Sequence, residues 1–432
     1  MIPMRKTSFL AAALLGLFVA ACGNKGFQTV EVAQFKEAIK KPSVVLVDVR
    51  TPQEFAQGHI DNALNIDVKD AQFIENIKGA IPPESKVAVY CRSGKRSADA
   101  AQQLEAQGYE VLNLDGGITA WNEYRHKRDY VIVIHGGAGN IASVEKDSVK
   151  AATYYAALDS ALRIGGNVLD NGGKGPEAVI AVINYLENNP LFNAGKGATI
   201  TDEGTFELDA CIMEGKDLSA GAVAGIKTVK NPINAAYAVK TKSEHVLLAG
   251  EGADAFAAAQ GLEIVDNSYF VSPKTMKWVA ELSKKSKKNG TVGCVILDTD
   301  GNLTAGTSTG GRFRKQWGRI GDAPIVGAGT YADNNSCAVS CTGHGEYYIR
   351  HAVAFNLSAR YKYLGESLEE AAKYIIHTEL NSEAGNGGLV SVDKDGNIAM
   401  EFNSTGMYRG FLYKNEGTEG VVCKVGIGEK LK

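Results

Sequence analysis

The chain has 432 residues, of which 44% are hydrophobic and 22% are charged, as in an ordinary globular protein. This length exceeds one typical domain, so two or three domains are expected. The net charge of −3 gives no electrostatic basis for nucleic-acid binding. The seven cysteines are widely spaced and form no Cys-x-x-Cys pair, which argues against a dense disulfide scaffold and against structural zinc.

Residues 1–21 read as a signal peptide. Arg5 and Lys6 precede an apolar run of small residues that ends in Val19-Ala20-Ala21-Cys22. A transmembrane anchor is the alternative, but the apolar run is short for a bilayer span. The ending resembles a bacterial lipobox, which implies that Cys22 is lipidated and becomes the mature N-terminus. The protein would then be exported and would contact a membrane through a lipid anchor only, facing the periplasm or the cell surface.

Residues 26–127 predict a first domain in which strands alternate with helices. Continuous apolar strands are expected over 44–50, 85–90 and 111–114, and a helix over 98–107. This alternation indicates a small parallel α/β domain.

Cys91 lies where the second of these strands ends and the helix begins. Backbone N–H groups and the helix dipole favour an anion at such a position. Arg92, Lys95 and Arg96 add positive charge, so a lowered thiol pKa and an available thiolate are expected. A buried structural cysteine is the alternative interpretation.

This domain resembles a single-domain rhodanese. The matching pieces are 47–50 (Val-Asp-Val-Arg), 54–60, 90–94 (Tyr-Cys-Arg-Ser-Gly) and 114–121. The resemblance implies that Cys91 accepts a sulfane sulfur from a donor and holds it as a persulfide within the loop of Arg92, Ser93, Gly94, Lys95 and Arg96. A cysteine phosphatase would need an arginine six positions after the cysteine, where this chain has Ser97. Rhodanese-like domains also act as binding or sensing modules, so that role stays open.

Residues 129–432 predict a second domain. A buried strand over 130–134 is followed by a glycine-rich turn, 135–140, that lacks the Lys-Ser/Thr ending of a phosphate loop. Helical periodicity covers 150–164 and 176–186, and 205–210 has the pattern of a strand.

Thr291 is the most informative residue of this domain. A lysine-rich stretch, 283–289, runs through Gly290-Thr291 into an apolar strand over 292–297. Cutting the Gly290–Thr291 bond would give Thr291 a free α-amine beside its own hydroxyl, so one residue would carry both nucleophile and base. A Gly-Thr turn before an ordinary strand is the alternative.

Motifs after Thr291 supply the other parts that acyl transfer needs. The Thr342 hydroxyl and the Gly343 N–H can donate to an oxyanion. Arg319 can bind a carboxylate and Asp322 an ammonium, which suits the zwitterionic end of an amino acid. A surface ion pair is the other interpretation of Arg319 and Asp322.

The motifs of the second domain together resemble the plant-type asparaginases and isoaspartyl peptidases, which are N-terminal-nucleophile hydrolases. They include 192–197, 307–311, 318–322, 341–346 and 403–409, in the family's order. The resemblance implies a four-layer αββα sandwich and a precursor that cuts itself into an α part ending at Gly290 and a β part beginning at Thr291. It also implies a dimer of αβ units, with isoaspartyl dipeptides and asparagine as substrates.

Residue roles follow from the same resemblance. Thr291 is the nucleophile, Thr309 positions it, Asn193 supports it, and Thr342 with Gly343 forms the oxyanion hole. Arg319 and Asp322 bind the substrate's α-carboxylate and α-amine. No cofactor is implied for catalysis. A structural sodium ion is implied on the backbone carbonyls of Leu186, Glu187, Asn189, Phe192, Ala194 and Lys196.

Three alternatives stay open at this point. The glycosylasparaginase branch shares the fold, although 309–311 and 342–346 look more like the isoaspartyl peptidase branch. The chain could be a sulfurtransferase with an inactive hydrolase scaffold. A non-enzymatic surface lipoprotein fits least well with two complete sets of catalytic residues.

Overall fold

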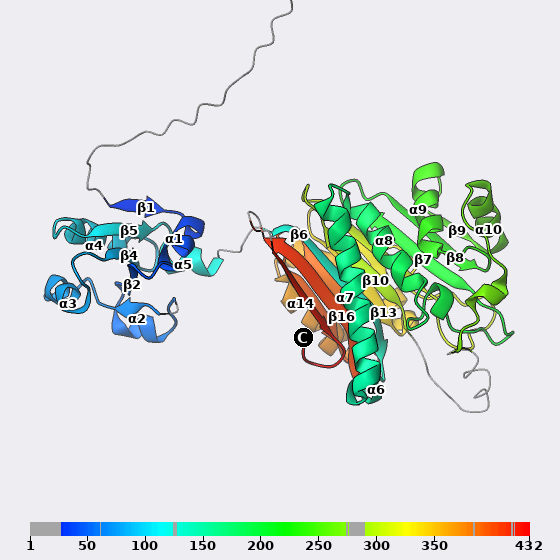
Figure 1. The fold of residues 1–432 in the computed structure, drawn as a ribbon. Coiled ribbons are helices and arrows are strands. Elements are labelled where there is room, and N and C mark those ends of the chain that lie inside the picture. The colour runs from blue at the N-terminus through cyan, green and yellow to red at the C-terminus, as the bar shows by residue number, and fades with distance from the viewer. Residues whose placement is uncertain are drawn as a thin grey trace, which may run out of the picture. The chain divides into compact units, whose positions relative to one another are not determined.

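The computed structural model describes residues 27–60, 62–123, 128–273, 275, 290–382, 385–415, 418 and 420–432. The expected signal peptide, Cys22 and the lysine-rich stretch lie outside these residues. The chain divides into two compact units, Met1–His126 and Lys127–Lys432 (Figure 1). Within the described residues, no helix is both long enough and apolar enough to cross a membrane.

The first unit is a five-stranded parallel sheet covered by helices. Its strand order is β1-β5-β4-β2-β3, with β1 Gln28–Val30, β2 Val44–Asp48, β3 Leu64–Asn65, β4 Lys86–Tyr90 and β5 Glu110–Leu114. The helices are α1 Val32–Ile39, α2 Pro52–Ala56, α3 Phe73–Ala80, α4 Lys95–Glu105 and α5 Gly117–Glu123. Alternate residues of β4 enter two separate apolar cores, one on each face of the sheet, which is the burial expected of a parallel sheet.

The helix after Cys91 begins three residues earlier than the sequence predicts. Gly94 adopts a left-handed φ of +85° immediately before the helix, so the loop ends at Gly94 and α4 begins at Lys95. The basic residues Lys95 and Arg96 therefore belong to the first turn of the helix.

The second unit contains two sheets in which most neighbouring strands are antiparallel. The eight-stranded sheet has the order β17-β16-β6-β10-β11-β7-β8-β9, with β6 Arg128–Gly139, β7 Leu208–Glu214, β8 Ala220–Ile226, β9 Leu247–Ala249, β10 Val292–Leu297, β11 Leu303–Thr309, β16 Gly406–Asn415 and β17 Val421–Gly426. The four-stranded sheet has the order β12-β13-β14-β15, with β12 Thr330–Ala332, β13 Cys337–Gly343, β14 Gly387–Asp393 and β15 Ile398–Phe402.

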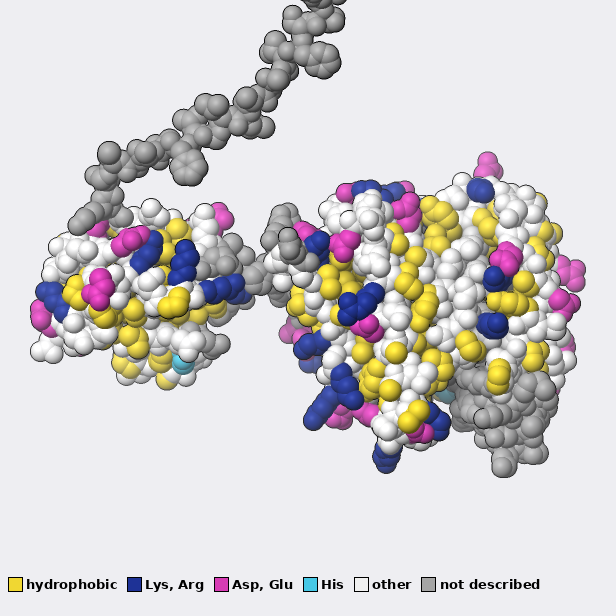
Figure 2. Space-filling view, viewed as in Figure 1, with side chains coloured by type: hydrophobic (Ala, Val, Ile, Leu, Met, Phe, Trp, Pro, Cys, Tyr) yellow, Lys and Arg dark blue, Asp and Glu magenta, His cyan; other side chains and the backbone are white. Residues whose placement is uncertain are grey.

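Helices cover the outer face of each sheet. One set comprises α6 Ala142–Lys146, α7 Ser148–Asp170, α8 Gly175–Glu187, α9 Pro232–Lys242 and α10 Gly250–Ala259, with the short turns η1 Gly195–Gly197 and η2 Asn267–Phe270. The other comprises α12 Gly345–Arg350, α13 Val353–Ala359, η3 Arg360–Leu364, α14 Leu368–Tyr374, η4 Ile375–Glu379 and α15 Leu380–Ser382. Figure 2 shows acidic and basic side chains interspersed on the α7 and α8 face.

Three apolar cores establish the layering of this unit. One lies between α7–α10 and the eight-stranded sheet, a second between the two sheets, and a third between the four-stranded sheet and α12–α15. Strand periodicity explains the division: Val131 and Val133 of β6 face the inter-sheet core, whereas Ile132 and Ile134 face the helices. The predicted αββα sandwich is therefore confirmed.

Some element bounds predicted from the sequence are wrong. The expected glycine-rich turn over 135–140 is instead the continuation of β6, which pairs with β16 as far as Gly139 opposite Gly406. Glycine is needed there for close packing, since a Cβ on Gly136 would lie 2.4 Å from the Phe192 ring. The strand expected over 205–210 begins at Leu208, and α8 continues one residue beyond the predicted helix end.

Candidate functional site

Three threonines from three strands converge between the two sheets. Val295 and Leu297 of β10 face the inter-sheet core, so Thr291 is in phase with them at the start of that strand. The same alternation brings Thr309 to this face at the end of β11 and Thr342 near the end of β13. All three side chains are buried.

Hydrogen bonds fix the groups on either side of the Gly290–Thr291 bond, namely the Gly290 carbonyl and the Thr291 hydroxyl. The Thr291 hydroxyl donates to Thr309 Oγ1 at 3.2 Å, and the Thr309 hydroxyl donates to the Gly290 carbonyl at 3.0 Å. Asn193 Nδ2 donates to the same carbonyl at 2.7 Å. The Asn193 amide is fixed in turn because its Oδ1 accepts from the Thr199 N–H at 2.8 Å. Two donors therefore face the carbonyl oxygen on which negative charge would develop during self-cleavage.

A pocket opens directly on this bond. The residues predicted from the sequence that line it are Gly290, Thr291, Thr309, Arg319, Asp322 and Gly343. Gly311, Arg312, Gly321 and His344 complete the lining. Thr342 and Asn193 are not part of the lining. Thr342 lies behind it, where its Oγ1 accepts from the Ala138 N–H at 3.3 Å, which leaves its hydroxyl proton available to donate.

Arg319 and Asp322 give the pocket one cation and one anion beside Thr291. Arg319 is oriented by Glu346, which accepts from its Nε and its Nη2 at 3.1 Å each. Asp322 is 5% exposed, and its Oδ2 has no hydrogen-bond partner among the described residues. Burial raises the pKa of Asp322 to about 7 against the opposing charge of Arg319. An unpartnered buried carboxylate oxygen in a pocket is well placed for a ligand's ammonium group.

A buried polar network behind Thr291 was not predicted from the sequence. His135 Nδ1 lies 3.1 Å from the Thr291 carbonyl oxygen and Nε2 lies 2.9 Å from Ser340 Oγ. Burial lowers the pKa of His135 to about 3, so the ring is neutral. A carbonyl only accepts, so Nδ1 donates to it and Nε2 accepts from Ser340, whose Oγ lies 2.7 Å from Thr307 Oγ1.

The sequence carries one signal for this network. His135, Thr307 and Ser340 occupy strand positions whose neighbours two residues away are core residues, and polar residues at such positions need partners. The network fixes the backbone carbonyl of Thr291.

Gly137 allows β6 to approach the Gly290–Thr291 bond closely. It adopts a φ of +108°, and a Cβ there would lie 3.1 Å from Gly290 Cα and 3.3 Å from the Thr291 nitrogen. Gly137→Ala is expected to slow self-cleavage at least about tenfold, because both the backbone strain and the contact move the scissile bond. A time course of intact mass measures this rate.

Gly139→Ala is the matched control, since a Cβ at Gly139 meets nothing within 4 Å. Equal cleavage rates in the two variants would contradict this role of Gly137.

The segment after α8 carries backbone carbonyls that are implied to hold a sodium ion. Side chains are excluded where carbonyls gather: a Cβ on Gly195 would lie 2.4 Å from the Glu187 oxygen, and one on Gly197 would lie 1.9 Å from the Phe192 oxygen. Backbone oxygens are the ligands that hard cations prefer. The Leu186, Asn189 and Ala194 carbonyls accept backbone hydrogen bonds, but a carbonyl oxygen has two lone pairs, so this does not remove them as ligands.

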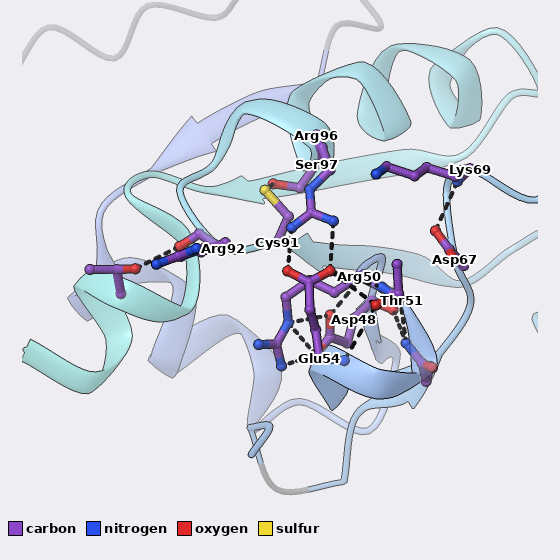
Figure 3. Close-up of polar contacts among 12 residues, drawn as sticks. Asp48, Arg50, Thr51, Glu54, Asp67, Lys69, Cys91, Arg92, Arg96 and Ser97 are labelled. Carbon is purple, nitrogen blue, oxygen red and sulfur yellow. Dashed lines mark hydrogen bonds and ion pairs between the residues drawn. The ribbon is translucent and has the colours of Figure 1, made fainter. Parts of the chain in front are cut away.

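Cys91 lies at the predicted place between β4 and α4 in the first unit. Figure 3 shows its Sγ beside the Ser97 hydroxyl, at 3.4 Å. The same figure shows that Arg96 donates two hydrogen bonds to Glu54 of α2, at 2.8 and 2.7 Å. Arg96 is therefore tied to α2 instead of being a free cation of the loop.

The Cys91 thiol has the lowered pKa that the sequence predicts. Burial raises its pKa, but hydrogen bonds from the Ser97 hydroxyl and from the backbone of Ser97, Ser93 and Gly94 outweigh burial. Hydrogen-bond donors, more than the basic side chains named from the sequence, thus stabilise the thiolate. In the sequence, Ser97 is notable only for standing where a phosphatase would have arginine.

Comparisons with known proteins assign both units. Residues 128–422 match the asparaginase family, and residues 31–124 match the rhodanese-like domain. An isoaspartyl peptidase of Salmonella typhimurium is 44% identical over 300 residues, which cover 66% of this chain and 96% of that protein. An isoaspartyl peptidase of Escherichia coli is 43% identical, covering 66% of this chain and 94% of that protein.

A mammalian relative shows the same pattern. An isoaspartyl peptidase/L-asparaginase of Bos taurus is 41% identical over 286 residues, which cover 64% of this chain and 91% of that protein. With two thirds of its length matched to one family, the chain belongs to the asparaginase family and carries a rhodanese-like domain ahead of it.

Proposed function

We propose that this protein is a self-cleaving hydrolase of isoaspartyl dipeptides and L-asparagine with Thr291 as its nucleophile. The observation that carries the proposal is the pocket in which Thr291 lies together with Arg319 and Asp322. One cation and one buried carboxylate match the two charges of a substrate's α-amino acid end. The names of the similar peptidases agree with this chemistry.

Self-cleavage begins from the contacts of the intact chain. The Thr291 oxygen attacks the Gly290 carbonyl carbon, and the negative charge that forms on the carbonyl oxygen is stabilised by Asn193 and Thr309. The bond to the Thr291 nitrogen breaks as this nitrogen takes up the proton lost by the hydroxyl, which leaves a free α-amine and an ester between Gly290 and the Thr291 oxygen. Water hydrolyses this ester to the Gly290 carboxylate and the free Thr291 hydroxyl.

Hydrolysis of substrate uses the freed groups. Arg319 and Asp322 hold the α-carboxylate and the α-ammonium, which directs the side-chain carbonyl of the isoaspartyl or asparagine substrate toward Thr291. The α-amine of Thr291 takes the hydroxyl proton as the oxygen attacks. Thr342 and the Gly343 N–H stabilise the oxyanion. The amino acid or ammonia leaves with a proton, and water then releases aspartate.

Intact-mass analysis of purified, tag-free protein tests this proposal, combined with an assay for aspartate released from isoaspartyl-leucine. A fragment that begins at Thr291 and releases aspartate is the expected result. A chain that stays uncut and inactive after prolonged incubation would favour the inactive-scaffold alternative. Release of aspartate only from glycosylated asparagine would favour the glycosylasparaginase alternative.

The first unit carries a second proposed activity, sulfur transfer through Cys91. The buried thiol with a lowered pKa, surrounded by backbone donors, suits a thiolate that accepts a sulfane sulfur and is held as a persulfide. Ser97 in place of a phosphate-binding arginine argues against a phosphatase.

Cys91→Ser is expected to abolish thiosulfate:cyanide sulfur transfer and to leave isoaspartyl hydrolysis unchanged. The hydroxyl of serine cannot form a persulfide, and Cys91 lies in a unit separate from Thr291. Thiocyanate formation measures the first activity and aspartate release the second. Wild-type protein without transferase activity would instead indicate a binding module.

We also propose that the protein is exported and lipid-anchored, that it forms a dimer of αβ units, and that it binds a structural sodium ion. The 1–22 segment supports lipidation at Cys22, and an N-terminal fragment carrying the mass of a diacylglyceryl-modified Cys22 would demonstrate it. The family assignment supports a dimer of αβ units. The backbone carbonyls of Leu186, Glu187, Asn189, Phe192, Ala194 and Lys196 would hold a sodium ion and stiffen the loop that carries Asn193.

A further inference from the structure

The pocket has one more charged side chain than is needed to pair with the α-carboxylate and the α-ammonium of an amino acid. Three charged residues line it: Arg312, Arg319 and Asp322. Arg319 is bonded to Glu346, and Asp322 is available for an ammonium group. Among the residues that the structure describes, no carboxylate forms an ion pair with Arg312, which is exposed on the pocket wall.

The residue before this arginine, Gly311, is tied to the site through both of its backbone polar groups. The Gly311 N–H donates to Thr309 Oγ1 at 2.9 Å, and the Gly311 carbonyl accepts from Asn193 Nδ2 at 2.8 Å. Arg312 therefore directly follows a residue whose partners, Thr309 and Asn193, contact Thr291 and the Gly290 carbonyl. Its side chain lies within electrostatic range of Glu346, where it helps to lower the pKa of that carboxyl.

The charges of the two candidate substrates differ in a way that matches this extra cation. Asparagine has one carboxylate and one ammonium group, which Arg319 and Asp322 satisfy. An isoaspartyl dipeptide has a second carboxylate, on the leaving amino acid. Standard bond lengths place that carboxyl carbon only about 2.5 Å from the leaving nitrogen, so it lies close to Thr291 in the bound substrate.

We propose that Arg312 binds the carboxylate of the leaving amino acid and selects isoaspartyl dipeptides that have a free C-terminal carboxylate. The inference rests on the proposed hydrolase function and specifies its substrate class. Asparagine lacks this carboxylate, and an isoaspartyl bond inside a longer chain presents an amide in its place. Both are therefore poorer substrates than the dipeptide.

The test compares isoaspartyl-leucine, its C-terminal amide and asparagine as substrates of the processed wild type and of Arg312→Gln. Wild type is expected to prefer the free acid to the amide about tenfold in kcat/KM, and Arg312→Gln to lose that preference. The loss should appear in KM with kcat nearly unchanged, because the contact is made equally in the ground state and the transition state. Arg312→Lys should restore part of the preference.

Arg314→Gln is the matched control, since Arg314 lies two residues further on and pairs with Asp202 instead of lining the pocket. It should keep the wild-type ratio of acid to amide. A wild type that hydrolyses acid and amide equally well, or an Arg312→Gln variant that keeps the preference, would overturn the role of Arg312. Failure to hydrolyse any of the three substrates would instead refute the proposed hydrolase function.

Discussion

Replacing Thr291 with alanine is expected to leave the chain uncut and to lower aspartate release by at least about 10⁴-fold. The variant has neither the hydroxyl that attacks Gly290 nor, in the absence of cleavage, the free amine that would serve as base. Mass spectrometry would show one chain in place of two fragments, and the aspartate assay would stay at background. A Thr291→Ala variant that is cut at this bond would contradict the assignment of Thr291.

Thr291→Ser is the matched control, because serine keeps the hydroxyl and yields the same amine on cleavage. We expect it to be cut and to be active, both more slowly than wild type. Neither variant should unfold the domain, since alanine removes a single hydroxyl hydrogen bond, to Thr309, worth about 1 kcal/mol. Comparable thermal unfolding of the uncut Thr291→Ala variant and the wild-type precursor would therefore separate lost chemistry from lost fold.

The layers of the second unit could be predicted because strand periodicity divides its residues between two faces. Val131 and Val133 alternate with Ile132 and Ile134, and the same alternation places Thr291 on the inter-sheet face. The extent of β6 could not be predicted, because glycine-rich sequence normally favours turns. The pairing with β16, far along the chain, keeps Gly136–Gly139 within the strand despite an irregular register there.

The functional site, too, could be predicted from the sequence only in part. Arg319 and Asp322 stood out because opposite charges in a short motif have chemical meaning on their own. The contact between His135 and Ser340 joins residues 205 positions apart, so a local pattern can mark each as a polar residue in need of a partner but cannot pair them. At Cys91 the loop was evident from the sequence, but the pairing of Arg96 with Glu54 depends on how α2 packs against α4. Such tertiary contacts decide which of several nearby charges act on a reactive group.

Asp322→Asn is expected to lower kcat/KM for isoaspartyl-leucine about a hundredfold or more. Asparagine has nearly the shape of aspartate but cannot pair with the substrate's ammonium as a charged group, and a charge pair in a desolvated pocket is worth several kcal/mol at most. Processing should continue in this variant, because Asn193 and Thr309, which hold the Gly290 carbonyl, are unchanged. Mass spectrometry before the assay checks that the variant is cut.

The pH profile shows whether this loss comes from the charge of Asp322. With a pKa of about 7, Asp322 becomes protonated and unable to bind the ammonium as pH falls below 7. The Thr291 amine must also lose its proton, with an ordinary pKa of about 8. Log kcat/KM of wild type should therefore fall with a slope approaching two below both values, whereas Asp322→Asn should fall with a slope of one. Equal slopes would contradict the assignment.

The raised pKa of Asp322 also makes stability depend on pH, in the opposite direction to substrate binding. Because burial raises the pKa of Asp322 from 3.8 to about 7, the folded protein binds this proton more tightly than the unfolded chain does. The contribution of Asp322 to stability is therefore greatest below pH 4 and is lost as pH rises to 7, so the ionised form needed for binding is the less stable one. Thermal unfolding above pH 7 should show Asp322→Asn more stable than wild type, and added aspartate should stabilise wild type more than the variant. A less stable variant at that pH would mean that Asp322 has a structural partner when ionised, which would argue against its role as a ligand site.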